Sequence, residues 1–375
     1  MKKEYLYTPG PVTVPQEVLL KLAEPVYHHR TPRFREMFAE VNQKLKTVFR
    51  TENDVLTFTS SGTGAMEASF VNFLSPGDKV ITVNGGKFGE RWTNLAKAYG
   101  VDYNEITLEW GTAPDPDQIA KLLADDPSIK AVYTELTETS TGTVYDIEAI
   151  GKVVDATDAI LVVDAVSGIA ADDIHVDAWN VDICVAGSQK AFMIPPGLGF
   201  MSVSEKAWKL AETSNLPKFY FDAKKAKKSV ANNDTPFTPA HVLIGALNVS
   251  LSMIIDEGID AVIARHARLA NAVRAGANGL GLTLYSKSPS NALTAIAFEG
   301  IDAEELRKHL KADGVSVAGG QNEAKGKIIR VAMMGYANEA DVMNALSTLE
   351  RALKKMGADF EPGVSLAAAQ ASLME

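Results

Sequence analysis

The stretch that decides the fold is ILVVDAVSGIAADDIHVDAWNVDICVAGSQKAFMIPPGLGF, residues 160–200. It contains two short apolar runs: ILVV (160–163), which Asp164 follows directly, and ICVA (183–186), after which a short turn leads to Lys190. Continuous apolar runs of this length are typical of strands buried on both faces, as in a parallel sheet. Ligands of open α/β sheets bind outside the carboxyl ends of the strands, so one crevice can hold both the acid and the amine.

Each of these two residues also has a plain structural interpretation. An Asp at a strand end is often a turn former, and a Lys after a strand usually points into solvent. Taken as a pair, with Gly187 and Ser188 in the turn before Lys190, they fit one chemistry. Pyridoxal phosphate (PLP) is held as a Schiff base by a lysine, and a carboxylate such as Asp164 keeps its ring nitrogen protonated. Lysine suits this role because burial and nearby charge readily lower its pKa.

A second motif indicates an anion site. VLTF (55–58) is predicted to be a strand, SSGTG (60–64) a turn of small residues, and AMEA (65–68) the beginning of a helix. The free N–H groups and the dipole at a helix N-terminus attract a phosphate, and glycine lets the backbone approach it closely. Ser61 and Thr63 add hydroxyl donors. Neither the Walker lysine nor the GxGxxG pattern is present, and an ordinary helix cap is the alternative.

Two further predicted strands, KVITV (79–83) and AVYT (131–134), also lead to candidate residues. Phe88, at a helix start, is either a core aromatic or a ring that stacks on a ligand. The hydroxyl-rich turn at Thr139 donates to a ligand or only forms a turn. Strands and helices alternate over residues 55–203. This alternation predicts a mostly parallel sheet with helices on both faces.

The composition limits the classes of function. The chain has 375 residues, of which 46% are hydrophobic, and a formal net charge of −10. This charge argues against nucleic-acid partners and anionic membrane surfaces. No apolar run approaches the roughly 18–20 residues of a membrane helix, and MKKEY (1–5) does not open a secretory signal. The single cysteine, Cys184, lies in an apolar run, which fits a cytoplasmic location. No Cys/His set has zinc spacing, so no metal site is expected.

The motifs together resemble the class V aminotransferases, most closely their alanine–glyoxylate and serine–glyoxylate (serine–pyruvate) branch. The resemblance extends over nearly the whole chain, in the family's order. It is carried by TPGP (8–11), SSGTGAMEAS (60–69), ETSTG (138–142), VVDAVSG (162–168), GSQKAF (187–192), PPGLGF (195–200) and the region of Arg330. It implies the α/β fold of fold-type I PLP-dependent transferases, with a mostly parallel sheet and a smaller C-terminal α+β domain.

The resemblance implies a role for each candidate residue. Lys190 is the catalytic lysine, and Asp164 faces the ring nitrogen. Arg330 binds the substrate carboxylate, for which a planar guanidinium is the natural partner, and Gly10 lies in an arm near that carboxylate. The other expected cofactor contacts are Phe88, Ser61, Gly62, Thr63, Thr139, Gln189 and Thr238. From its residue type alone, Arg330 can equally be an edge-strand arginine in a surface ion pair.

The resemblance also implies a homodimer with shared active sites. Thr238 matches a residue that contacts the phosphate bound by the neighbouring subunit. The chain departs from its relatives at three positions: Thr63 replaces a frequent His, Phe88 a frequent Trp, and Thr235 a frequent aromatic residue. Phe88 keeps the stacking ring but loses the indole donor. Because Thr235 replaces an aromatic residue, the resemblance does not decide whether position 235 contacts the ligand.

Four segments are expected. They are an N-terminal arm over the active site (1–20), a large PLP-binding domain (21–258), a small C-terminal domain (259–360) and a weakly held tail (361–375). The small domain is expected to contain two strands (293–298 and 327–332) and two covering helices (302–313 and 338–356).

The expected activity is transamination between alanine or serine and a 2-oxo acid, glyoxylate or pyruvate. One alternative is another donor such as aspartate, which needs an extra cation that His29, Arg30 or a loop lysine can supply. A second is a non-catalytic subunit or scaffold, since some relatives were named as components of a soluble hydrogenase. The intact pair of Asp164 and Lys190 argues against that reading. A sulfur-removing lyase needs a mobile loop cysteine, and Cys184 lies in a predicted strand.

Overall fold

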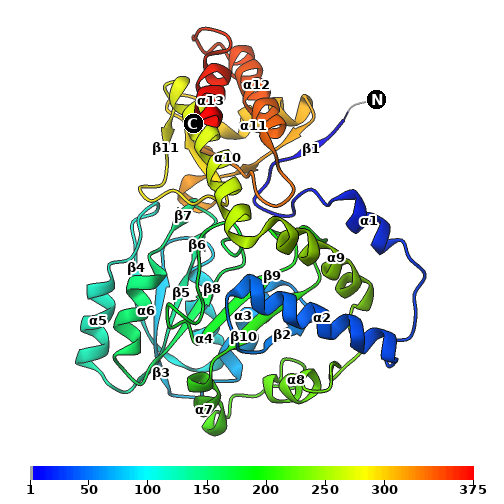
Figure 1. Cartoon of the computed structure of the whole chain (residues 1–375). Coiled ribbons are helices and arrows are strands. Elements are labelled where there is room, and N and C mark those ends of the chain that lie inside the picture. Colours follow the sequence, from blue (N-terminus) through cyan, green and yellow to red (C-terminus); the bar gives the residue numbers. More distant parts are fainter. Residues whose placement is uncertain (1–2) are drawn as a thin grey trace.

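A seven-stranded sheet forms the centre of the larger part of the computed structural model, which describes residues 3–375 (Figure 1). Its order is β2-β10-β9-β8-β5-β3-β4. The strands are β2 (Val55–Phe58), β3 (Lys79–Asn84), β4 (Asp102–Thr107), β5 (Ile129–Glu135), β8 (Ile160–Asp164), β9 (Ile183–Gly187) and β10 (Gly199–Val203). All pairings are parallel except those of β10, which runs antiparallel to both β9 and β2. The predicted mostly parallel sheet is confirmed.

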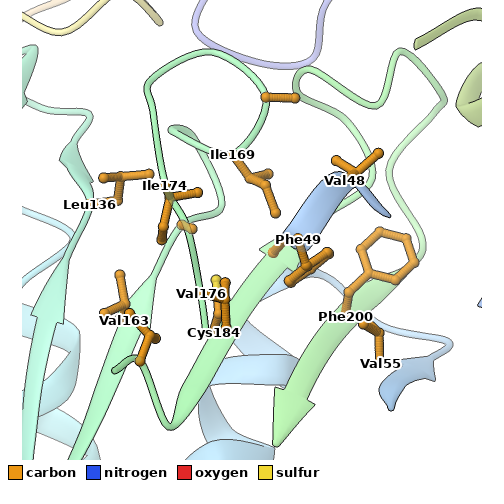
Figure 2. Close-up of a cluster of buried hydrophobic side chains, with 14 of the residues drawn as sticks. Val48, Phe49, Val55, Leu136, Val163, Ile169, Ile174, Val176, Cys184 and Phe200 are labelled. Carbon is orange, nitrogen blue, oxygen red and sulfur yellow. The ribbon is translucent and has the colours of Figure 1, made fainter. Parts of the chain in front are cut away.

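The central strands are buried on both faces, which explains their continuous apolar runs. In β9, Cys184 belongs to the hydrophobic cluster on one face, whereas its neighbour Val185 belongs to the cluster on the other. Figure 2 shows part of the first cluster, in which Val163, Cys184 and Phe200 come from three neighbouring strands and which also contains Phe49. Cys184 is a buried free thiol.

Helices cover both faces of the sheet (Figure 1). The face of Cys184 packs against α1 (Gln16–Leu22), α2 (Pro32–Phe49), α5 (Pro116–Asp125), α6 (Ile147–Asp155) and α9 (His241–Glu257). The opposite face packs against α3 (Gly62–Val71), α4 (Glu90–Tyr99), α7 (Glu205–Thr213) and α8 (Ala223–Val230). The helix α2 begins after its N-cap Thr31, whose side chain accepts a hydrogen bond from the N–H of Phe34, and it ends at Arg50 in the left-handed conformation.

The C-terminal part is built on a four-stranded antiparallel sheet of order β11-β12-β15-β14. Its strands are β11 (Thr283–Leu284), β12 (Thr294–Ala297), β14 (Ala318–Gly319) and β15 (Ile328–Val331). The helices beside it are α10 (Ile259–Gly279), α11 (Ala303–Ala312), α12 (Glu339–Lys355) and α13 (Val364–Met374). Arg330 therefore lies on an inner strand, and its interpretation as an edge-strand arginine is wrong. The sequence predicted β12 and β15 but not the two-residue strands that flank them.

The expectation of a weakly held tail after residue 361 is wrong. The segment forms α13, in which Ala369 is fully buried. The carboxylate of Glu350 on α12 anchors the start of this helix, because it accepts hydrogen bonds from the N–H of Gly363 (2.7 Å) and of Ser365 (2.9 Å). An acid at a helix N-terminus satisfies free N–H groups and complements the helix dipole.

The N-terminal arm connects the two parts of the molecule. Its strand β1 (Tyr5–Leu6) pairs in parallel with β13 (Val315–Ser316) of the C-terminal part. Further along, the N–H of Val12 donates to the carbonyl of Gln189, 3.2 Å away. The arm therefore passes directly over the loop of Lys190. Residues 1 and 2 of the expected arm, and with them part of the N-terminal segment considered for a signal, lie outside the described residues.

The helices α9 and α10 meet at Gly258 with an angle of 84° between them. Gly258 has a positive φ of 89°, a conformation that favours glycine. We propose this bend as the boundary between the large and the small domain. Within residues 3–375, no single helix is long and apolar enough to cross a membrane, and α9 with α10 reaches that length only as this bent pair.

Candidate active site

One edge of the large sheet gathers most of the residues that the sequence predicted. Asp164 is the last residue of β8. The segments that follow β2, β3, β5 and β9 contain, in this order, Ser61, Phe88, Thr139 and Lys190. These residues line one cavity of about 190 Å³. Its lining also includes the predicted Gly62, Thr63 and Gln189, together with Met66, Arg91, Thr137, Val166 and Ser167, which the sequence analysis did not single out. This edge holds the carboxyl ends of the parallel strands, where open α/β sheets bind ligands.

Lys190 is held in an enclosed position. Its residue is 7% exposed, and its amine donates a hydrogen bond to the carbonyl of Pro9 in the arm. The loop is fixed by Ser188, whose hydroxyl donates to the carbonyl of Pro195 (2.9 Å). Burial, against the attraction of Asp164 and helped by nearby arginines, lowers the pKa of the Lys190 amine to about 8. More of the amine is therefore free of its proton near neutral pH than in an ordinary lysine, as a nucleophile or base requires.

Asp164 ends β8 at the floor of the cavity and is 5% exposed. Burial raises the pKa of its carboxyl group. The N–H of Val166, which donates to Oδ1 of Asp164 at 2.8 Å, opposes this rise, and so do the positive charges of Arg91 and Lys190. These contacts favour the ionised form of the carboxyl group.

The helix α3 presents its N-terminus to the cavity. Its N-cap, Ser61, makes no side-chain capping hydrogen bond, so this hydroxyl is available to a ligand. Gly62 is tightly enclosed, since a Cβ atom there would lie 2.6 Å from Cγ2 of Val166. The first N–H groups of a helix have no partner inside it and attract anions. This end of the cavity is therefore suited to a phosphate.

Arg91 adds a cation to this end of the cavity. Its guanidinium lies 4.6 Å from the ring centroid of Phe88, and Nη1 donates a 2.9 Å hydrogen bond to Oγ1 of Thr63. Arg91 lies in the first turn of α4, three residues after Phe88, which lies in the turn that precedes this helix. This spacing was the sequence signal for Arg91, which was not among the predicted site residues.

The residues of the cavity fit PLP. The carboxylate of Asp164 suits a protonated ring nitrogen, the amine of Lys190 suits the aldehyde, and the end of α3 suits the phosphate. In addition, Oε1 of Gln189 is buried and has no hydrogen-bond partner within residues 3–375. A buried acceptor without a donor is destabilising, and a ligand in the cavity can supply the missing contact.

The family of the chain follows from comparison with known proteins. The sequence profile described as "Aminotransferase class-V" matches residues 4–344. The chain is a class V aminotransferase. Enzymes of this family depend on PLP, so PLP is its cofactor. The predicted family, fold class and cofactor are therefore confirmed.

Relatives match the aminotransferase over its whole length. A protein named "Soluble hydrogenase 42 kDa subunit" from Anabaena cylindrica is 43% identical and covers 98% of each chain. An L-aspartate–glyoxylate aminotransferase of Paracoccus denitrificans is 36% identical, with 97% of this chain and 95% of that protein covered. A serine–glyoxylate aminotransferase of Hyphomicrobium methylovorum is 35% identical, with 97% and 93% covered. The crystal structure of pyridoxamine–pyruvate aminotransferase from Mesorhizobium loti superposes with a TM-score of 0.95, at 31% identity, covering 100% of this chain and 98% of that one.

In the aminotransferase, Gly10 touches the lysine. A Cβ atom at this position would lie 2.5 Å from Cδ and 2.7 Å from Nζ of Lys190, and the φ angle of Gly10 is +134°. Both facts require glycine there. The arm thus packs against Lys190 through a residue without a side chain.

Arg330 lies behind the cavity rather than in its lining. It is 6% exposed, and its Nε and Nη1 donate to the carbonyls of Gly319 (2.9 Å) and Thr139 (2.8 Å). Burial lowers the pKa of its guanidinium to about 10. Thr139 lines the cavity, so one residue separates Arg330 from the cavity. The role of Arg330 as a ligand of the substrate carboxylate stays a prediction.

The structure does not bring Thr238 to the cavity of its own chain. Thr238 is exposed and lines a separate hollow with Tyr220, Thr235 and Phe237. Its predicted contact with the neighbouring subunit stays a prediction. Arg30, a possible cation for an aspartate donor, is paired with Asp234 and donates to the carbonyl of Thr235 (2.6 Å).

Proposed function

We propose that this aminotransferase transfers the amino group of alanine or serine to glyoxylate or pyruvate. The observation that carries the proposal is the convergence of Asp164, Lys190 and the N-terminus of α3 on one cavity. Serine–glyoxylate aminotransferase is among the relatives that match the whole chain. A donor with a charged side chain needs a further free cation, and the pairing of Arg30 with Asp234 removes one candidate.

Each residue then has a defined task. When bound, PLP supplies an electron sink that stabilises a carbanion at the substrate α-carbon. Asp164 keeps the ring nitrogen protonated, and Phe88 packs against the ring. Lys190 would hold the cofactor covalently, and its amine would move the proton of the substrate α-carbon. Arg330 receives the substrate carboxylate beside Gly10. The remaining proposed cofactor contacts are Ser61, Gly62, Thr63, Thr139 and Gln189.

Aspartate is a second candidate donor. Arg91 lines the cavity and is a cation that the sequence analysis did not consider. The L-aspartate–glyoxylate aminotransferase among the relatives also supports this alternative. The complete set of Asp164, Lys190 and the N-terminus of α3 argues against a non-catalytic scaffold.

We further propose that the enzyme is a cytoplasmic homodimer with shared active sites. Phe219 is 73% exposed, and Tyr220 stacks on Phe237 with ring centroids 5.2 Å apart, beside the hollow of Thr238. Exposed aromatic groups of this kind mark surfaces that another chain covers. A second copy placed there would bring Thr238 to its phosphate.

The test is an absorption spectrum of the purified protein with PLP, before and after alanine, serine or aspartate is added separately. The proposal expects loss of the visible cofactor band and growth of the pyridoxamine band with alanine or serine. A change with aspartate alone would select the alternative donor. No change with any amino acid would reject the proposed reaction. Lys190→Ala is the control, for which no donor should convert the cofactor.

A further inference from the structure

A second buried carboxyl group lies beside Asp164. Glu135 ends β5 as Asp164 ends β8, and the register of the two parallel strands places them opposite each other. Paired positions of neighbouring strands point to the same face of the sheet. Glu135 is fully buried, and its carboxyl group is close enough to that of Asp164 for each group to shift the pKa of the other. The sequence signal was an acid at a strand end, the same as for Asp164.

A hydrogen bond between two carboxyl groups requires a proton on one of them, because ionised carboxylates only accept. Asp164 receives the N–H of Val166 and lies near the charge of Lys190, so it is the better site for the negative charge. Neither oxygen of Glu135 receives a hydrogen from an N–H or O–H group within residues 3–375. An ionised carboxylate without donors is the most unfavourable state for a buried acid.

Glu138 provides the contrast within the same site. It is equally buried, but it accepts hydrogen bonds from the N–H of Gly89 (2.9 Å) and from both the N–H and the hydroxyl of Ser140 (2.9 and 2.6 Å). Such donors stabilise a carboxylate. Burial raises the pKa of both carboxyl groups, but only Glu138 has hydrogen-bond donors that oppose the rise and favour its ionised form.

The charged groups around Glu135 raise the pKa of its carboxyl group, with one exception. Burial raises the pKa of Glu135 well above its ordinary value, and the charges of Asp164 and Glu138 raise it further. Arg91 opposes them. The phenol of Tyr145 is buried without a hydrogen-bond partner within residues 3–375, and burial raises its pKa well above its ordinary value.

We propose that Glu135 is a positioning residue, which remains protonated at neutral pH and donates a hydrogen bond that holds Asp164 ionised and oriented toward the cofactor ring nitrogen. The statement about Asp164 rests on the proposed function. The protonation of Glu135 rests on its burial, its position opposite Asp164 and the absence of N–H and O–H donors to its oxygens within residues 3–375. A neutral partner orients Asp164 without placing a second negative charge beside it, which would raise the pKa of Asp164.

The first test is infrared spectroscopy of the full-length holoenzyme at neutral pH, without amino donor. A protonated carboxyl group has a C=O stretching band that a carboxylate lacks. The difference spectrum between wild type and Glu135→Gln should contain this band, and that between wild type and Glu138→Gln should not. Absence of the band from the Glu135 difference spectrum would overturn the proposal. Because no donor is present, this result does not depend on whether the enzyme transaminates alanine or serine.

The second test compares two substitutions of Glu135. Glu135→Gln keeps a neutral hydrogen-bond donor of the same shape and should retain cofactor affinity within about threefold. Glu135→Leu removes the donor and should weaken cofactor affinity about tenfold or more, the scale of a hydrogen bond to a charged group. Glu135→Leu should also lower kcat rather than raise the KM of the amino donor. Equal losses in both variants, each shown to be folded by circular dichroism, would contradict a role as donor.

Discussion

Nη1 of Arg91 donates a 2.9 Å hydrogen bond to Oγ1 of Thr63, so a guanidinium on α4 is tied to the first turn of α3. Thr63 stands where the resemblance led us to expect a frequent histidine. Arg91 thus adds a permanent positive charge to the end of the cavity where the helix N-terminus already favours an anion. The charge also reaches the other end, since it favours the ionised form of Asp164.

We predict that Arg91→Met weakens PLP binding by about tenfold to a hundredfold, the range expected for a charge-assisted hydrogen bond. The measurement is a PLP titration of the cofactor-free protein, followed by fluorescence. Arg268→Met is the matched control, because Arg268 forms an exposed ion pair with Glu339 away from the cavity lining. Unchanged affinity in Arg91→Met would place the phosphate elsewhere.

Replacing Gly10 with alanine should abolish activity while leaving the protein folded. The new Cβ would collide with Cδ and Nζ of Lys190, and the φ of +134° is unfavourable for alanine. We expect kcat to fall at least about a hundredfold, since small displacements at a reacting group have effects of this size. Gly77→Ala separates the two causes, because Gly77 also has a positive φ (+82°) but open space around its Cβ position. That control should keep its kcat and lose about 1 kcal/mol of stability.

The lowered pKa of Lys190 predicts how the stability of the cofactor-free protein depends on pH. The pKa is about 8 in the folded protein, against 10.5 for an ordinary lysine. Between these values the unfolded chain binds more protons at this position, so the free energy of unfolding rises with pH, by at most about 1.4 kcal/mol per unit. Below pH 8 both states carry the charge and the contribution is constant.

Urea denaturation at intervals from pH 7 to pH 10 measures this effect. Wild type should gain stability relative to Lys190→Met as the pH rises from 8 to 10, because the methionine variant has no amine to titrate. Parallel curves for the two proteins would mean that the amine of Lys190 keeps an ordinary pKa.

The parts of this structure that the sequence predicted are those with local signals. The apolar runs before Asp164 and Lys190 are buried on both faces of the sheet, so composition alone revealed them. The pairing of Glu135 with Asp164 depends on which strands become neighbours, and no local pattern gives that register. The position of Arg91 in the site is likewise not given by a local pattern, because its partner Thr63 lies on a different helix.

A tertiary contact is also the reason why the sequence did not predict the C-terminal helix α13. The segment of α13 has no amphipathic pattern of polar and apolar residues, since small apolar residues lie all around it. What orders its start is the carboxylate of Glu350 on another helix, which accepts from Gly363 and Ser365. Tertiary contacts of this kind override weak local preferences.

The last prediction concerns the shared active site. If Thr238 serves the neighbouring subunit, a bulky substitution such as Thr238→Trp inactivates the site of the partner chain and spares its own. Lys190→Ala inactivates only its own site. When the two inactive variants are unfolded together and refolded, random pairing in a two-fold symmetric dimer should restore roughly a quarter of the wild-type sites. The measurement is transaminase activity of the mixture against each variant refolded alone. A mixture that stays inactive, with mixed dimers shown by affinity tags on the two chains, would mean that each chain builds its phosphate site alone.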